Sequence, residues 1–184
     1  THEELGGAET HATKSGVNHL SCANDVECLT NMRRLFSYLP SNNLDDPLWQ
    51  ISDDPVDRMD KILDEIVPEN PNQPYDMKDV IQHVIDKDTF FEIHPDFAQN
   101  IIVGFARFDG IVAGIAASNP DELSGIMEPN SSDKYDRFIM FLDAFNIHLV
   151  NLSDTPAFPP GDRWERMGVI RHGAKNLHGY SHLT

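Results

Sequence analysis

The fold is decided by one stretch near the middle of the chain: Ile101-Ile-Val-Gly-Phe-Ala-Arg-Phe108, then Asp109-Gly110, then Ile111-Val-Ala-Gly-Ile-Ala-Ala117. An Asp-Gly pair between two apolar runs predicts a β-hairpin, because both residues accept the positive φ angles of a tight turn. Both runs are apolar at almost every position, so we expect both faces of the sheet to be covered. Gly104 and Gly114 indicate close approach of another chain segment.

The residues after the hairpin predict an α/β unit. A helix is expected from Ser131 to about Asn146, because its apolar side chains recur at helical spacing. A buried strand is expected at 147–152, a loop at 154–161 and a second helix from Arg163 to Thr184. The order hairpin, helix, strand, helix predicts an α/β fold in which the first helix is a crossover connection.

The residues before the hairpin predict helices joined by a proline-rich connector. Residues 1–23 show no periodicity and are expected to form a loop or a segment packed on something else. Helices are expected at 24–39, capped by Asn24, at 55–66, and at 76–88, capped by Asp76. Six of the twelve prolines lie between residues 40 and 75, and a short strand follows at 90–93.

The composition excludes several classes of function. The 184 residues carry a formal charge of −16, and residues 24–96 alone hold 17 acidic and 6 basic side chains. Such a chain lacks the basic face that nucleic acids or anionic lipids require, and it has no apolar run long enough to span a bilayer. We therefore expect no nucleic-acid partner and no membrane contact.

Cysteine and histidine give weak signals. Cys22 and Cys28 are expected to be two reduced thiols at a helix start, which is typical of a reducing compartment. His178 and His182 share one face of the last helix, but no third ligand accompanies them, so no metal site is predicted. His148, inside an apolar run, is interpreted as a core residue.

Longer motifs make the chain similar to a known family over essentially all of its residues. They are Gly6-Gly7-Ala8, Ser15-Gly16-Val17, Phe36-Ser-Tyr-Leu-Pro-Ser-Asn-Asn43, Asp54-Pro-Val-Asp-Arg58, Pro74-Tyr-Asp-Met77, Asn100-Ile-Ile-Val-Gly-Phe-Ala-Arg107, Asp143-Ala-Phe-Asn-Ile147 and Ile170-Arg-His-Gly-Ala-Lys175. Together they resemble biotin-dependent acyl-CoA carboxyltransferases of the propionyl-CoA carboxylase β-chain, methylmalonyl-CoA decarboxylase and transcarboxylase type.

The resemblance implies a crotonase-like (ββα) carboxyltransferase fold. Residues 1–23 would be the tail of the N-terminal domain, 24–88 the helical acidic connector, and 89–184 the first half of the C-terminal crotonase-like domain. It also implies biotin carried on a partner protein or domain, a coenzyme A thioester as substrate, and a biotin carboxylase or biotin carrier subunit as partner. A hexamer of paired chains in the cytoplasm, or in the mitochondrial matrix of a eukaryote, would follow.

The resemblance also assigns site residues. Ser118, Asn119 and Pro120 stand where the family has Asn-Gln-Pro. Ala157, Phe158 and Gly161 belong to the stretch that matches the family's Asp-Val-Pro-Gly-Phe-Leu-Pro-Gly, and with the first three they are expected to form the biotin pocket. Ser15, Gly16 and Val17 would form the loop on the acyl-CoA side.

The resemblance identifies no catalytic side chain. In this family backbone N–H groups stabilise the enolates formed during carboxyl transfer between carboxybiotin and the α-carbon of a short-chain acyl-CoA. One alternative stays open: a divergent crotonase-like scaffold or interaction subunit without carboxyl-transfer activity. The non-glycine residues Ala157 and Met167 favour it slightly, because the family usually has glycine there.

Overall fold

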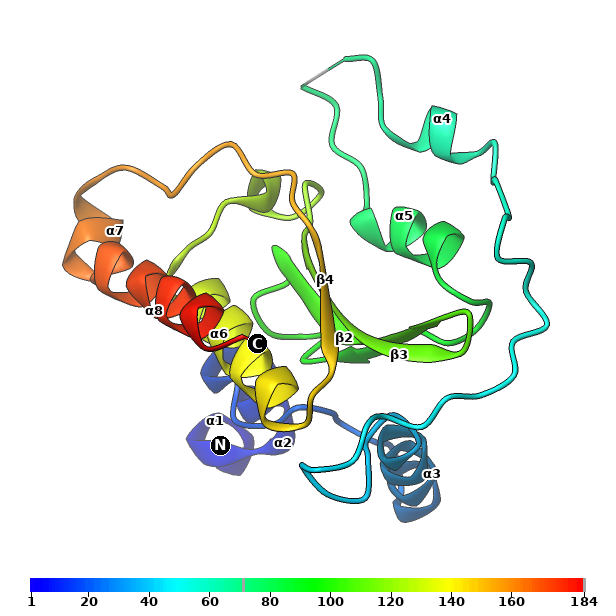
Figure 1. Cartoon of the computed structure of the whole chain (residues 1–184). Helices are drawn as coiled ribbons and strands as arrows, with labels where there is room; N and C mark the ends of the chain where they lie inside the picture. The colour runs from blue at the N-terminus through cyan, green and yellow to red at the C-terminus, as the bar shows by residue number, and fades with distance from the viewer. Residues whose placement is uncertain (71, 184) are drawn as a thin grey trace.

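The computed structural model describes residues 1–70 and 72–183, so the parts of the predicted segments that fall on Pro71 and Thr184 lie outside it. Its centre is a four-stranded sheet in the order β1 (Phe91–Ile93), β2 (Ile101–Phe108), β3 (Ile111–Ser118) and β4 (His148–Leu152). The first three strands are antiparallel, and β4 runs parallel to β3. Figure 1 shows α5 over one face of this sheet, and α6 and α8 on the other side. The predicted α/β fold class is confirmed.

The predicted hairpin forms in full register. Ile101 pairs with Ser118 and Phe108 with Ile111, so only Asp109 and Gly110 connect the strands. Both turn residues have positive φ, 50° and 73°, as a two-residue hairpin loop requires. The hairpin therefore fixes which side chains of β2 and β3 point to each face of the sheet.

Alternation along the strands divides the core into two parts. One face of the sheet packs against α6 (Pro129–Ala144), and its β2 residues are Ile101, Val103 and Phe105. The opposite face, with Ile102 and Ala106, packs against α5 (Met77–Val84). Both faces of the hairpin are thus covered, as its apolar runs predict.

Most of the first fifteen residues are helical, whereas the sequence predicted a loop or a segment packed on something else for residues 1–23. They form α1 (His2–Gly6), α2 (Ala8–Thr10) and a π-helical turn (His11–Ser15). A capping box explains the start, because the Thr1 hydroxyl accepts from Glu4 N while the Glu4 carboxylate binds the Thr1 amine. These short helices have no apolar stripe, which is why periodicity missed them.

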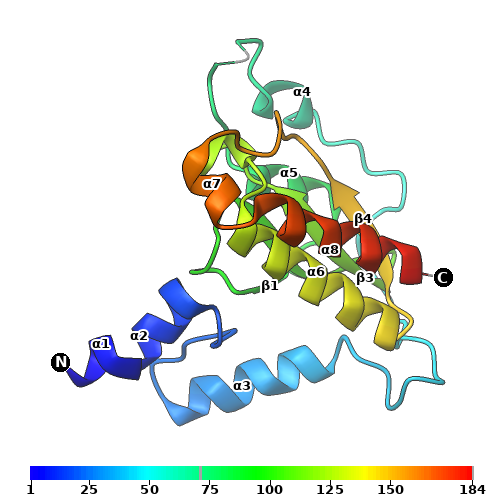
Figure 2. The same cartoon turned by 90° about the vertical axis from the view of Figure 1, so that its left-hand side faces the viewer.

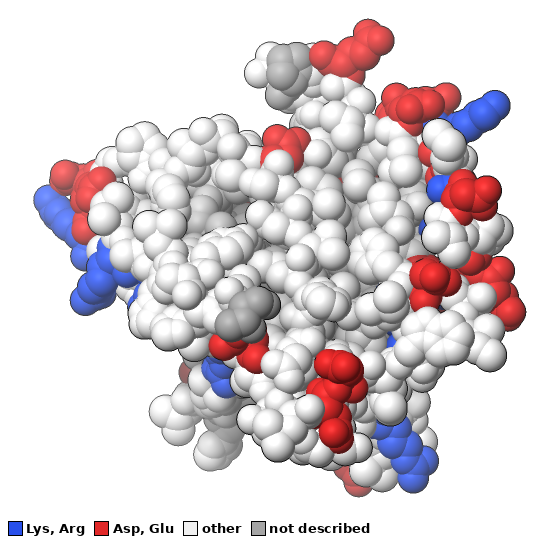
Figure 3. All heavy atoms as spheres, in the orientation of Figure 1, with Lys and Arg blue, Asp and Glu red and all other residues white. Residues whose placement is uncertain are grey.

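The connector contains less helix than predicted. α3 (Asp25–Phe36) forms with the predicted Asn24 cap, and α5 forms with the Asp76 cap. The helix predicted at 55–66 is reduced to α4 (Leu63–Ile66), and residues 55–62 form turns. Figure 2 shows the connector as a long excursion that lies beside the sheet, and Figure 3 shows its acidic side chains along one edge of the molecule.

Three predictions for the last third of the chain need correction. The helix α6 begins at Pro129 under a Glu128 cap, two residues before the predicted Ser131. The strand β4 is only partly buried because it lies at the sheet edge, and His148 is exposed, so the core interpretation is wrong. The predicted final helix is two helices, α7 (Asp162–Arg166) and α8 (Val169–His182), separated at Gly168, whose φ is +78°.

Candidate functional site

A cleft lies at the end of the sheet where β3 and β4 finish. Its volume is about 840 Å³, and it is lined by connector residues 67–70 and 72–75, the turn at 120–124 and the loop at 154–156. The two turns follow the ends of neighbouring parallel strands, which is where ligands bind in α/β sheets. Of the predicted pocket residues, Pro120 lines this cleft directly.

Ser118 and Asn119 are buried below the cleft and hold its walls together. The Ser118 hydroxyl accepts from Asp154 N at 2.6 Å, which joins the end of β3 to the loop after β4. The Asn119 side chain accepts from Met77 N at 3.1 Å, at the start of α5. Both predicted side chains therefore position backbone rather than project into the open space.

Tyr75 closes the third side of the cleft. Its hydroxyl donates to Asp154 Oδ2 at 2.7 Å. The pKa of Tyr75 is raised, chiefly by burial and then by the hydrogen bond and charge of Asp154, so the phenol stays protonated. Sequence reasoning missed Tyr75 as a site residue, although the Pro74-Tyr-Asp-Met77 motif contained it.

Gly125 allows the two loops to approach each other. Its φ is +66°, and a Cβ there would lie 2.7 Å from Asp154 O and 3.3 Å from Ser118 Cβ. The preceding Leu123 and Ser124 also have positive φ, which is strained for residues with side chains. Backbone strain of this kind is concentrated at functional sites because the surrounding structure must maintain it.

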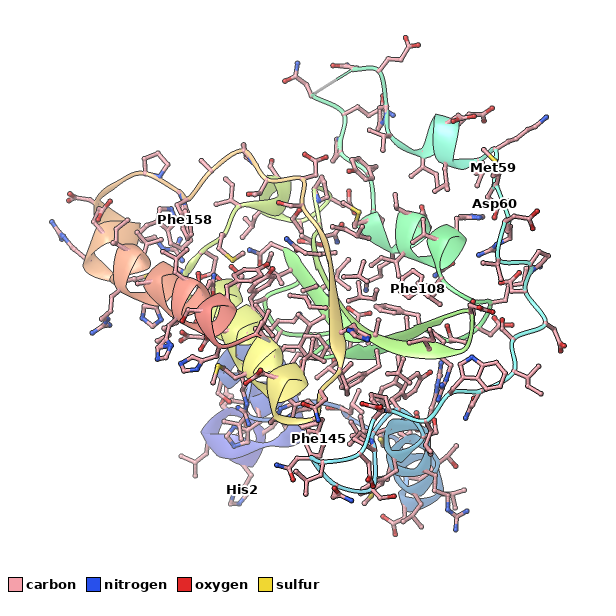
Figure 4. All side chains as sticks on the ribbon, viewed as in Figure 1. His2, Met59, Asp60, Phe108, Phe145 and Phe158 are labelled. Atoms are coloured by element: carbon pink, nitrogen blue, oxygen red, sulfur yellow. The ribbon has the colours of Figure 1, made fainter. Side chains whose placement is uncertain are left out.

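The other predicted biotin-pocket residues lie beyond the cleft. Ala157, Phe158 and Gly161 are exposed, on the loop that leads to α7. Figure 4 shows Phe158 beside the helical pair α7 and α8. Its ring packs on Gly173 of α8 so closely that a Cβ at Gly173 would lie 2.7 Å from the Phe158 ring. The structure therefore places residues 118–120 at the cleft and packs Phe158 against α8, whereas Ala157 and Gly161 are exposed.

The predicted acyl-CoA-side loop borders the same end of the sheet. Gly16 has a φ of +63° and abuts the Phe97 ring, and its carbonyl accepts from His94 Nε2 at 3.0 Å. Ser15 and Val17 on either side are exposed. Among the described residues no hydrogen bond joins 15–17 to 118–120 or 157–161, so the two predicted parts are not hydrogen-bonded to each other within this chain.

The loop 94–100 lies between the two predicted parts. Lys134 donates to the carbonyls of His94, Phe97 and Ala98 at 2.9, 2.7 and 3.3 Å, and burial lowers its pKa to about 7. At the other end of the loop, the Asn100 carbonyl accepts from Asn119 N at 2.9 Å. A single buried lysine thus fixes the loop that both predicted parts touch.

We expect stability to fall as pH drops through the range between about 6.5 and 4 because of His94. Burial, aided by the positive charges of His19, Lys134 and Arg137, lowers its pKa to about 4. The folded state therefore binds this proton less readily than the unfolded chain, whose histidine pKa is about 6.5, and the loss reaches about 1–3 kcal/mol. Urea unfolding across this range measures it.

His94→Asn is the control for that prediction. Asn accepts the left-handed backbone that His94 adopts at φ 54°, and it does not titrate. The variant should show a shallower fall in stability over the same range. An unchanged slope in His94→Asn would assign the pH dependence to other groups.

Within residues 1–70 and 72–183, no group of three or more His, Cys, Asp or Glu side chains is placed to hold a metal ion. His178 and His182 lie with their rings 4.5 Å apart at the end of α8, without a third ligand among the described residues. No helix in the described part of the chain is long and apolar enough to cross a membrane.

A family model described as "Carboxyl transferase domain" matches residues 1–184. The chain belongs to the carboxyl transferase family. It is 49% identical over its whole length to the methylmalonyl-CoA decarboxylase subunit alpha of Veillonella parvula, and covers 36% of that protein. It is 48% identical, again over its whole length, to the mitochondrial propionyl-CoA carboxylase beta chain of Homo sapiens, and covers 34% of it.

Solved carboxyl transferases have the same fold. A crystal structure of transcarboxylase 12S, described as a hexamer assembly with methylmalonyl-coenzyme A and methylmalonic acid bound, matches the whole chain with a TM-score of 0.96 and 39% identity. The chain covers 35% of that protein. This likeness confirms the predicted crotonase-like fold and the resemblance from which it came, and the chain spans about a third of the relatives it matches.

Proposed function

We propose that this chain is part of a biotin-dependent carboxyltransferase that moves a carboxyl group between carboxybiotin and the α-carbon of a short-chain acyl-CoA of the propionyl or methylmalonyl type. The observation that carries the proposal is the family match over residues 1–184, shared with relatives named for these two acyl-CoA esters. Biotin supplies an activated carboxyl group, and the protein has to hold its ring system and exclude water.

The cleft at the end of β3 and β4 fits such a ring. Gly125 packs so closely on Asp154 that a Cβ at Gly125 would lie 2.7 Å from the Asp154 carbonyl oxygen. The cleft beside these two residues has a volume of about 840 Å³. We assign the biotin side to Ser118, Asn119 and Pro120, with Ala157, Phe158 and Gly161 on the adjoining loop. Backbone N–H groups of Ala157, Phe158 and Gly161 would stabilise developing negative charge, since such groups act without titrating. Pro120 has no N–H, and Asn119 N is already bonded to the Asn100 carbonyl.

We assign the acyl-CoA side to Ser15, Gly16 and Val17, which reach the same end of the sheet through the 94–100 loop. Supporting this, Figure 2 shows the short helices α1 and α2 set apart from the sheet, as the tail of a preceding domain would be. The division into 1–23, the connector 24–88 and the partial domain 89–184 is part of the proposal.

Partners follow from the same assignment. We propose a homo-oligomer of paired chains, in line with the hexamer named for transcarboxylase 12S, and a partner that carries biotin. A hexamer would complete the site if the 15–17 loop of one chain met the cleft of another. The compartment would be the cytoplasm or the mitochondrial matrix; the human relative is named as mitochondrial.

The test is a transfer assay on the full polypeptide that contains this chain. Methylmalonyl-CoA labelled in its free carboxyl group is supplied with free biotin, and label in biotin or released carbon dioxide is followed. Biotin-dependent loss of label from the thioester is expected. A well-folded oligomer that binds acyl-CoA but shows no biotin-dependent turnover would support the scaffold alternative instead.

A further inference from the structure

Two thiols lie together at the start of α3. Cys22 precedes the helix and is half-buried, whereas Cys28 lies in its second turn and is exposed. Asn31, one turn further along the same face of α3 as Cys28, donates its side-chain amide to Cys22 Sγ at 3.5 Å. The Cys22 sulfur therefore lies against the helix face that carries Cys28.

The backbone around the thiols is also fixed. Ala23 N donates to the Glu27 carboxylate at 2.8 Å, and Glu27 N donates to the Asn24 side chain at 3.0 Å. These bonds fold the residues before the helix back onto its first turn. As a result, Cys22 is held beside Cys28 rather than being free to move away from it.

We propose that Cys22 and Cys28 are a redox-active pair that closes to an intrachain disulfide in the presence of a disulfide oxidant such as oxidised glutathione. The inference does not depend on the carboxyl-transfer proposal. Closing the bond ties the segment that follows residues 1–15 to the start of the connector helix.

The disulfide forms in two successive thiol–disulfide exchange steps. The exposed Cys28 thiolate attacks one sulfur of oxidised glutathione, the S–S bond breaks, and one glutathione thiolate leaves. The Cys22 thiolate then attacks the Cys28 sulfur of this mixed disulfide and releases the second glutathione thiolate. Both protein thiols are oxidised, one oxidised glutathione becomes two reduced molecules, and the two thiol protons pass to the released thiolates.

The electrostatic surroundings set the speed of the first step. The pKa of the Cys28 thiol is raised, first by desolvation and then by its charge and hydrogen-bond interaction with Cys22. The neighbouring carboxylates of Asp25 and Glu27 raise it further. The attacking thiolate is therefore scarce at neutral pH, and the reaction should accelerate as pH rises.

One tryptic peptide tests the proposal, because both cysteines lie between Lys14 and Arg33 with no other basic cleavage site between them. The native protein is incubated with oxidised glutathione, alkylated and digested. Peptide 15–33 should lose two hydrogen atoms in mass and both alkylation sites, and dithiothreitol should restore them. A peptide that stays fully alkylated, or carries glutathione on either cysteine, would overturn the proposal.

The matched control moves one thiol around the helix. In the double variant Cys28→Ser with Leu29→Cys, the second thiol is exposed but points about 100° away from Cys22. This variant should accumulate glutathione adducts and form no internal disulfide, as should the single variants Cys22→Ser and Cys28→Ser. Equal closure in the double variant would show that chain flexibility, and not the observed placement, brings the thiols together.

Discussion

Replacing Arg107 by alanine should destabilise the protein by about 3–5 kcal/mol. The guanidinium is buried and donates to the carbonyls of Leu48, Gly110 and Ser37 at 2.8, 2.8 and 2.7 Å. It also lies 5.3 Å from the centre of the Tyr38 ring. Alanine removes the guanidinium donor of all three carbonyls, although the Gly110 carbonyl keeps Gln50 N as a donor at 3.2 Å, and it releases the connector from the hairpin turn.

Urea unfolding of the full polypeptide measures this loss, and proteolysis of residues 40–56 reports release of the connector. Arg34→Ala is the matched control, because Arg34 also bonds two carbonyls, of Asp88 and Phe90, but is exposed. It should cost about 1 kcal/mol. If Arg107→Ala loses no more than this control, the guanidinium does not hold the connector.

Replacing Gly125 by alanine should lower carboxyl transfer about 100-fold, because misplacing reacting groups by about 1 Å has an effect of that size. The added Cβ would collide with the Asp154 carbonyl and separate the two loops of the cleft, and the residue must keep a φ of +66°. The KM for biotin should rise together with the fall in kcat, since both loops bind the same group. Steady-state kinetics with free biotin as acceptor measures both constants.

Gly168→Ala separates the effect of the cleft from that of backbone strain. Gly168 also has a positive φ, +78°, but a Cβ there meets only the flexible end of Arg171, at 3.2 Å. Gly168→Ala should lose about 1–2 kcal/mol of stability, because alanine has to adopt a positive φ. Gly125→Ala should lose more, because its Cβ also meets a backbone carbonyl. Comparable activity in Gly125→Ala and Gly168→Ala would mean that the close approach of the loops does not matter for transfer.

Periodicity and turn chemistry predicted the centre of the fold because there the local signals agree with the packing. The Asp109-Gly110 turn and the alternation in β2 determine the register and the two cores. The strand β4 was predicted, but its burial and that of His148 were not predicted correctly, because an apolar run cannot show whether a strand will lie at the edge of a sheet. Periodicity also failed at residues 55–62, where helical spacing is present but the chain forms turns.

The site was only partly accessible from sequence. The family resemblance assigned residues in the stretches 118–120 and 157–161, and the structure joins Ser118 to Asp154 at the start of the second loop. Tyr75 belongs to the connector and lies 79 positions before its partner Asp154 in the sequence. No local sequence pattern predicts a contact between residues so far apart. In the second loop, Asp154 lies at the cleft whereas Phe158 packs against α8, and this separation likewise depends on tertiary packing.

Photo-crosslinking is the most direct test of whether the cleft beside Gly125 holds the biotin ring system. A biotin derivative with a short diazirine group is photolysed with the full polypeptide, and labelled residues are mapped by mass spectrometry with excess biotin as competitor. Labelling should be concentrated at 118–125 and 154–161 and be abolished by competition. Labelling that competes with biotin but lies elsewhere, with these two segments unmodified, would contradict the account.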